Sequence, residues 1–160
     1  MVIKLYSEYD FVPSYSKEND SGMDVLVKGF SKWENGSLVE VNTNRYRLES
    51  GESILIHTGL HFDIQKGYEC QVRSRSGLAL KQGLIVLNSP GTIDSKFHGE
   101  CNVIIINHSS VHHFINIDDR IAQFVFAPVT KVSFEIVESV DEFSNSDRGQ
   151  DGFGSTGVSS

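Results

Sequence analysis

Short apolar runs separated by turn-forming residues are the feature that most constrains how this chain can fold. The runs are rich in Val, Ile and Phe, and Gly, Asn, Asp or Pro stands at their ends, as is typical of short β-strands. Many short strands with frequent turns predict an all-β barrel, sandwich or jelly roll. The expected strands are residues 2–6, 53–57, 60–64, 68–73, 84–87, 101–107, 121–127 and 132–137.

Residues 74–83 break this pattern and predict one short helix. The segment offers a serine as N-cap candidate, helix-forming residues at 78–81 and a terminal Gly83. Residues 30–46 form a polar excursion, in which Asn35 and Gly36 predict the turn of a hairpin. No chemistry is assigned to this excursion from its residues.

Length and charge limit the classes of function. With 160 residues, of which 39% are hydrophobic, the chain can bury one ordinary core. The balance of 14 basic and 21 acidic residues gives a net charge of −7, which disfavours general attraction to nucleic acid or to an anionic membrane. An anionic ligand must therefore be held by a few local arginines or by a metal ion.

A cytoplasmic location is the expectation. Polar residues follow the first Met too soon for a secretory leader, and no apolar run approaches the roughly 20 residues that span a bilayer. The two cysteines, Cys70 and Cys101, lie inside strand-like runs and form no C-x-x-C pair, so we expect reduced thiols in the core.

Four interior segments place polar residues where strands or the helix begin or end. Each has a structural alternative: a turn leading into a strand, a plain capped helix, a surface loop, or the exposed edge of a sheet. At the helix start, free N–H groups and the helix dipole also favour an anion. The segments are residues 21–25, 75–77, 88–100 and 118–123.

The glycine-rich tail, residues 148–157, carries Arg148, Phe153, Ser155 and Thr156. Glycine lets backbone N–H groups approach a phosphate, hydroxyl and guanidinium groups add donors, and Phe offers a flat face to a base. A plain disordered C-terminus has the same composition. The tail therefore gains meaning only from the segments that precede it.

Together with the tail, these segments occur in the order and spacing of the five motifs of the trimeric dUTPase family, which the chain resembles over nearly its whole length. The residues that resemble the motifs are SGMDV (21–25), RSGLA (75–79), NSPGTIDSKFHGE (88–100), DRIAQ (119–123) and RGQDGFGSTG (148–157). Any one of these matches would be weak, but five in order are specific.

The resemblance implies a jelly-roll-like β-subunit, residues 1–143, with a mobile C-terminal arm, residues 144–160. It also implies a homotrimer in which three chains build each active site, with the arm closing over a neighbouring subunit's site. The implied reaction is hydrolysis of dUTP to dUMP and pyrophosphate, which limits uracil in DNA and supplies dUMP for dTMP synthesis. Neither nucleic acid nor membrane is an expected partner.

The resemblance also implies roles for particular residues. Asp94 is expected to orient and activate the attacking water, because water is a poor nucleophile toward a negatively charged phosphate. Mg²⁺ would be bound mainly by the substrate phosphates, with Asp24 and Gln123 holding metal-bound waters. The residues expected to bind phosphate are Arg75, Ser76 and Gly77 at the helix and Arg148, Ser155 and Thr156 on the arm.

The third motif is expected to select deoxyuridine. Groups at Asn88, Gly91, Thr92 and Ile93 would read uracil, since cytosine would leave buried groups mispaired and the methyl group of thymine would clash. Phe153 would stack on the base, with Gly154 beside it. Phe97 stands where the family usually has Tyr beneath the sugar, and we expect preference for deoxyribose to be kept.

The chain departs from the family pattern at three places. Ser74 and Asp151 differ from the usual Pro and Gly of the family, and the excursion at residues 30–46 is longer than usual. That excursion could bind a partner, so a nucleotide-gated binding protein is the first alternative to the enzyme. A dCTP deaminase is the second, although its further acid/base residue has no matching motif here. A zinc site at His108, His112 and His113 is disfavoured because no Cys or carboxylate stands at ligand spacing.

Overall fold

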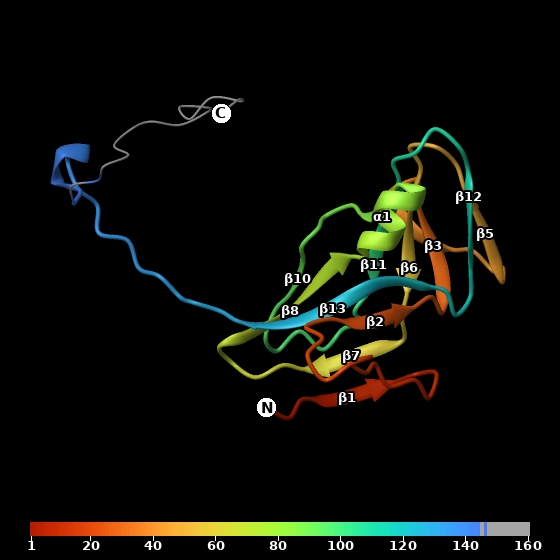
Figure 1. The fold of residues 1–160 in the computed structure, drawn as a ribbon, viewed down its shortest axis with the longest axis horizontal. Coiled ribbons are helices and arrows are strands. Elements are labelled where there is room, and N and C mark those ends of the chain that lie inside the picture. Colours follow the sequence, from red (N-terminus) through yellow and green to blue (C-terminus); the bar gives the residue numbers. More distant parts are fainter. Residues whose placement is uncertain (145, 147–160) are drawn as a thin grey trace. The chain divides into compact units, whose positions relative to one another are not determined.

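The computed structural model describes residues 1–144 and 146, which fall into two units, Met1–Thr130 and Lys131–Ser160 (Figure 1). The first unit is an all-β sandwich whose one α-helix, among the described residues, is the predicted short one. Its elements are β1 (Lys4–Ser7), β2 (Met23–Leu26), β3 (Gly29–Glu34), β4 (Ser37–Glu40), β5 (Arg45–Leu48), β6 (Ser53–His57), β7 (Leu60–Asp63), β8 (Tyr68–Ser74), α1 (Ser76–Gln82), β9 (Leu84–Val86), β10 (Gly91–Ile93), β11 (Val103–Asn107), β12 (His113–Asn116) and β13 (Arg120–Pro128).

Two antiparallel sheets form the body of this unit. One has the strand order β10-β8-β13-β2 (Figure 1), and the other has the order β4-β3-β6-β11-β9. Two smaller ladders, β1-β7 and β12-β5, complete it. Because β2 and β13 pair, residues of the first and fourth segments singled out above lie side by side at one sheet edge, and the second segment directly follows β8, the other neighbour of β13.

A single apolar cluster joins the sheets. Alternate residues of β11 point inward, since Val103 and Ile105 are buried and Ile104 is only partly so. Phe30 from the five-stranded sheet and Phe124 from the four-stranded sheet are both fully buried in this cluster. Burial of aromatic and branched side chains is the main stabilising term for such a fold.

Both cysteines belong to this core, as predicted. Cys70 on β8 and Cys101 just before β11 are buried and unpaired in the described part of the chain. Burial raises the pKa of both thiols, and that of Cys101 reaches about 12.

The predicted hairpin within residues 30–46 is confirmed. Strands β3 and β4 pair from Ser31↔Glu40 to Glu34↔Ser37, with Asn35 and Gly36 between them. Both turn residues have positive φ, 49° and 84°, which is the backbone of a two-residue hairpin turn and explains the Asn-Gly sequence.

The strand predicted at residues 132–137 is wrong. These residues belong to the second unit and have no strand assignment, and their apolar side chains are exposed, with Phe134 at 89% and Ile136 at 96%. The alternation of a strand is present, but a strand also needs a paired neighbour. Among the described residues of this unit the structure has one short 3-10 helix, Val140–Glu142, capped by Ser139.

The predicted arm at residues 144–160 falls almost wholly outside the described residues, so its boundary stays a prediction. Among the described residues, the structure contains no helix of the length and apolar character that a membrane crossing requires.

Candidate active site

A pocket of about 390 Å³ gathers residues from three of the segments that the sequence singled out. Asp24 comes from β2, Gln123 from β13, and Arg75, Ser76 and Gly77 from the start of α1. Strand pairing fixes the first contact, because Asp24 and Gln123 are register partners across β2 and β13. The pocket therefore forms where the sheet edge meets the helix.

An ion-pair network organises the wall of this pocket. Arg75 Nε lies 2.9 Å from Asp24 Oδ1, and Arg75 Nη2 donates to Asp24 Oδ2 at 3.4 Å. Arg75 Nη1 also donates to the backbone oxygen of Arg120 at 2.8 Å, and Arg120 Nε lies 3.7 Å from Asp24 Oδ2. These contacts hold the Arg75 guanidinium in one orientation before any ligand binds, which reduces the entropy lost on binding.

The charge of the pocket favours an anion. Arg75 and Lys81 line it together with one carboxylate, Asp24, so cations are in excess among the lining residues. A local excess of this kind can hold an anionic ligand even though the whole chain carries a net charge of −7.

The start of α1 differs from the sequence prediction. Arg75, with extended backbone, occupies the N-cap position, and the structure gives it no side-chain capping bond within the described residues. Ser74 instead ends β8, where its Oγ accepts a hydrogen bond from Val86 N at 2.9 Å. The serine N-cap was therefore wrong, because the hydroxyl is used to tie β8 to β9. The first N–H groups of the helix are left open to a ligand.

Gln123 is held at the back of the pocket by its neighbours. Its Nε2 donates to the backbone oxygen of Ser74 at 3.0 Å, and its Oε1 accepts no hydrogen bond from the described part of the chain. Gly22 makes room for this amide, because a Cβ at that position would lie 2.1 Å from Gln123 Oε1.

The third motif lies on the opposite edge of the same sheet. Gly91, Thr92 and Ile93 form β10, which pairs with β8, and Asp94 follows directly at the surface. Gly91 packs closely against its neighbours, since a Cβ there would lie 3.2 Å from both Asn88 Nδ2 and Val72 Cβ.

Phe97 is half exposed, at 47%, and its ring covers Gly99, where an added Cβ would lie 2.5 Å from the ring Cζ. Its backbone N–H donates to the oxygen of Asp94 at 3.2 Å, which closes the turn after β10. This turn fixes the backbone that carries the Asp94 carboxylate.

One chain thus brings only part of the predicted site together. Asp24, Arg75, Ser76, Gly77 and Gln123 share the pocket, whereas Asn88, Gly91, Thr92, Ile93, Asp94 and Phe97 do not line it. Strands β2 and β10 are the two edges of a four-stranded sheet, so three strand spacings of about 4.8 Å, or roughly 14 Å, separate them. Arg148, Phe153, Gly154, Ser155 and Thr156 lie outside the described residues.

Sequence reasoning missed Lys81 and gave Arg120 no role. Lys81 lies four residues after Gly77, so the two residues share one face of α1, and this spacing was the available signal. Arg120 stands in the fourth segment, but its contact with Asp24 depends on the pairing of β13 with β2.

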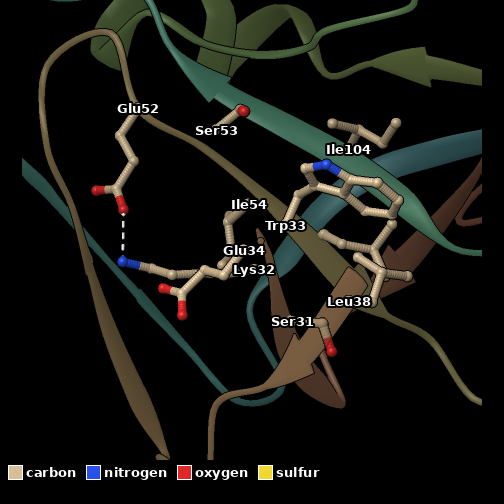
Figure 2. Close-up of a pocket in the computed structure, with 10 residues that line it drawn as sticks. Ser31, Lys32, Trp33, Glu34, Leu38, Glu52, Ser53, Ile54 and Ile104 are labelled. Carbon is tan, nitrogen blue, oxygen red and sulfur yellow. Dashed lines mark ion pairs between the residues drawn. The ribbon is translucent and has the colours of Figure 1, made fainter. Parts of the chain in front are cut away.

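A larger pocket, of about 660 Å³, lies at the β3–β4 hairpin (Figure 2). Figure 2 shows the Lys32–Glu52 ion pair, 3.0 Å long, on one side and the apolar side chains of Trp33, Leu38 and Ile104 on the other. Hydrogen bonds with Tyr46 and Glu52 raise the pKa of Lys32. Burial alone would raise the pKa of Glu52, but hydrogen bonds from Tyr46, the Glu49 backbone and Lys32 outweigh burial and lower it. Because Glu34 and Glu52 outnumber the one lining cation, Lys32, this larger pocket is a poorer phosphate site than the smaller one.

Comparison with known proteins points to one family. A family model described as dUTPase matches residues 40–157. The deoxyuridine 5'-triphosphate nucleotidohydrolase of Ehrlichia canis is 45% identical, over 98% of this chain and 94% of that protein. The protein of the same name from Nautilia profundicola is 44% identical, over 97% of this chain and 96% of that protein.

Solved structures share the fold. A mutant dUTPase of Staphylococcus bacteriophage 80alpha, solved with dUpNHpp, superimposes with a TM-score of 0.76 at 24% identity, covering 98% of this chain and 99% of that chain. A mutant dUTPase from phage phi11 of S. aureus, described with a structural Mg(II) ion, gives a TM-score of 0.70 at 21% identity, covering 89% of this chain and 100% of that chain.

Proposed function

This chain belongs to the dUTPase family, and from that premise we propose that it hydrolyses dUTP to dUMP and pyrophosphate. The observation that carries the proposal is the pocket that the oriented Arg75 guanidinium, Lys81 and the open start of α1 line together. A triphosphate is the ligand that uses such a set of donors, since each of its groups offers anionic oxygens.

Asp94 activates the water in this proposal. Its carboxylate is exposed at the end of β10, where it can accept a proton from a water directed at the α-phosphorus. Arg75, Ser76 and Gly77 hold the phosphates, and Arg148, Ser155 and Thr156 engage the last of them when the arm closes. Phe153 stacks on the base, with Gly154 beside it. The pyrophosphate then leaves as the product that the phosphate-binding groups have stabilised.

Mg²⁺ fits this pocket as a partner of the substrate. Among the described residues no group of three or more His, Cys, Asp or Glu side chains could hold a metal ion by itself, and Asp24 already contacts Arg75. Asp24 and Oε1 of Gln123 are therefore suited to hold metal-bound waters, while the phosphates supply the direct ligands. The ion would withdraw negative charge from the triphosphate.

A homotrimer with shared sites accounts for the separation of the predicted residues. The pocket and the third motif lie on opposite edges of one sheet, so Asp94 does not line the pocket of its own chain. In a trimer, Asp94 of one copy can lie beside the pocket of another copy. A closed three-fold arrangement repeats the same contact at each interface.

Selection of deoxyuridine rests on the third motif in this proposal. Asn88 and the backbone from Gly91 to Ile93 read the uracil edge, and the Phe97 ring excludes the ribose hydroxyl by packing beneath the sugar. We also place the activity in the cytoplasm, which the two unpaired cysteines support.

The test is an incubation of the purified chain with dUTP, UTP, dTTP and dCTP in Mg²⁺. Nucleoside monophosphate, pyrophosphate and deaminated product are measured for the wild type and for Asp94→Asn. We expect dUMP and pyrophosphate from dUTP alone, and a loss of roughly a hundredfold or more in the variant, the scale of a positioned base. Asp10→Asn, an exposed carboxylate outside the pocket, is the matched control.

Other outcomes would point elsewhere. Tight binding of dUTP without turnover would favour a nucleotide-gated binding protein. Release of a deaminated product from dCTP would favour a deaminase. Hydrolysis of UTP nearly as fast as dUTP would contradict the role given to Phe97.

A further inference from the structure

Ser31, His57 and Glu100 form a continuous hydrogen-bonded chain on a face of the molecule that the proposed hydrolysis does not use. Ser31 Oγ lies 2.8 Å from His57 Nε2, and His57 Nδ1 lies 2.8 Å from Glu100 Oε2. The other carboxylate oxygen, Glu100 Oε1, accepts from the backbone N–H groups of Thr58 at 2.9 Å and Gly59 at 2.7 Å. The backbone therefore holds the Glu100 carboxylate in place, the carboxylate orients the His57 imidazole, and the imidazole contacts the Ser31 hydroxyl.

The carboxylate determines which nitrogen of His57 carries the proton. Burial would raise the pKa of Glu100, but its hydrogen bonds from His57, Gly59 and Thr58 outweigh burial, and the pKa lies below its ordinary value. An ionised Glu100 accepts hydrogen bonds only, so it selects the tautomer with the proton on Nδ1. The lone pair of Nε2 then accepts the Ser31 hydroxyl proton, which is the arrangement of an activated serine nucleophile.

Strand pairing brings the three residues together from distant parts of the sequence. Gly29 pairs with His57 across β3 and β6, which places Ser31 two residues along the same strand. Ser31 keeps only 4% of its surface exposed, yet it lines a pocket of about 400 Å³ with His57 and Glu100. Figure 2 shows the Ser31 hydroxyl directed away from Trp33 and Ile104, the apolar side of the neighbouring pocket.

We propose that Ser31, His57 and Glu100 constitute a second, esterase-type site, in which Ser31 accepts an acyl group from a small carboxylic ester. Ser31 Oγ bonds to the ester carbonyl carbon while its proton passes to His57 Nε2. The carbon–oxygen bond to the alcohol then breaks, and the alcohol leaves with that proton. Water, deprotonated by the same nitrogen, attacks acyl-Ser31; the carboxylic acid is released and the proton returns to Ser31.

The rest of the pocket indicates the class of ester. Glu8, Glu40 and Glu100 line it against one cation, Lys28, so the local charge disfavours an anionic acyl group and favours a neutral or cationic ester. The Lys28 ammonium is held in place by Asp118 and lies 5.7 Å from the Tyr9 ring centroid. It is the charge in this pocket that can stabilise a developing oxyanion.

The experiment uses the full chain with a fluorophosphonate probe, followed by intact mass and peptide mapping. One adduct per chain, on Ser31, is expected. Ser31→Ala should abolish it, and His57→Gln should slow labelling roughly a hundredfold, the scale of a lost general base. Ser53→Ala, which changes an exposed serine on the neighbouring strand β6, is the matched control and should label as the wild type does.

A second readout uses three esters of short acids: neutral p-nitrophenyl acetate, cationic acetylcholine and the anionic mono-p-nitrophenyl ester of succinic acid. The first two should release p-nitrophenol and choline, with the anionic ester at least about tenfold slower because of the acidic pocket. Hydrolysis of dUTP, retained in Ser31→Ala, His57→Gln and Ser53→Ala, reports that the fold is intact and separates this proposal from the proposed main function.

Glu100 is a positioning residue, and a spectroscopic signature tests it. The far-downfield proton resonance of His57 Nδ1 bound to a carboxylate should disappear in Glu100→Gln and persist in Ser31→Ala. Absence of a Ser31 adduct in a protein that is folded by its thermal transition would overturn the proposal. So would labelling that is equally fast in His57→Gln, since the hydroxyl would then need no base.

Discussion

At the scale of single residues, Gly22 controls the position of a predicted metal-water contact. A Cβ there would displace Gln123 Oε1, which lies at the end of a flexible side chain. We therefore expect Gly22→Ala to cost less than about 1 kcal/mol of stability, as for a tolerated substitution. Hydrolysis of dUTP should nevertheless fall about tenfold or more, because misplaced groups of a site are costly.

A double-mutant cycle checks this interpretation. Gly22→Ala is measured alone and in a Gln123→Ala background, by kcat/KM and by urea unfolding. Since the second background lacks the amide, the glycine substitution should have little further effect there. Equal losses in both backgrounds would show that Gly22 acts through another contact.

Glu100 gives a pH-dependent contribution to stability. Its folded-state pKa is lowered because hydrogen bonds from His57, Gly59 and Thr58 outweigh burial. A lowered pKa stabilises the folded chain at pH values above the ordinary glutamate pKa of about 4.3, and the contribution is lost as pH falls through the folded-state pKa.

Urea unfolding between pH 7 and about pH 3 measures this contribution, since that window spans the ordinary glutamate pKa. The wild type should lose stability steeply in the acid limb, and Glu100→Gln should lose less over the same interval. Parallel acid limbs in the two proteins would contradict the assignment.

At the scale of elements, the end of α1 depends on one glycine. Gly83 has φ of 65°, and a Cβ there would lie 2.9 Å from Ser109 N. Gly67 also has a positive φ, 92°, but nothing lies within 4 Å of its added Cβ. Gly67→Ala should therefore cost only the backbone strain of about 1 kcal/mol, and Gly83→Ala should cost distinctly more because a collision is added.

Urea unfolding of both variants measures the difference between their losses of stability. Because both positions share the backbone strain, this difference reports the collision of the Cβ at position 83 with Ser109 N. If the two substitutions lower the free energy of unfolding equally, the prediction is contradicted, because the backbone around Ser109 would then move aside at little cost. Far-UV circular dichroism at low denaturant would show in addition whether α1 itself is lost.

The sequence predicted elements well where local pattern and tertiary partner agree. β6 has the predicted bounds, 53–57, and β8 extends one residue beyond the predicted 68–73, because both runs alternate and both lie between other strands. β10 was not predicted, since a three-residue strand beginning at Gly91 has no periodicity of its own and forms only through its register with β8. Residues 132–137 show the converse, an alternating pattern without a paired strand in the described chain.

The candidate site was predicted in the same uneven way. Asp24, Arg75 and Gln123 could be singled out because polar residues at the start of apolar runs are visible in sequence, and the structure brings them into one pocket. The Ser31–His57 contact could not be predicted from the sequence, because it depends on the pairing of β3 with β6. Pairing across a sheet is set by the whole fold and leaves no local signal.

At the scale of the whole molecule, the proposed trimer makes activity a property of pairs of chains. If Arg75 and Asp94 of one site come from different copies, Arg75→Ala and Asp94→Asn should complement each other. Each variant alone should be inactive, but co-expressed chains that mix at random should regain roughly a quarter of the wild-type activity, since one site in four receives both intact residues.

The measurement is dUTP turnover of the co-purified mixture, with sedimentation to establish the number of chains. Separately purified variants, mixed without exchange of subunits, serve as the control. A mixture that forms trimers yet stays inactive would place both residues of each site in one copy.

The buried cysteines have a practical consequence for following this molecule in solution. Alkylating reagents react with the thiolate, and burial raises the pKa of Cys70 and raises that of Cys101 to about 12. Neither sulfur can react until the core around it opens. The rate of alkylation of each cysteine, followed by mass spectrometry, therefore reports how often the core opens locally, at β8 for Cys70 and just before β11 for Cys101. The chain needs no added label for this measurement.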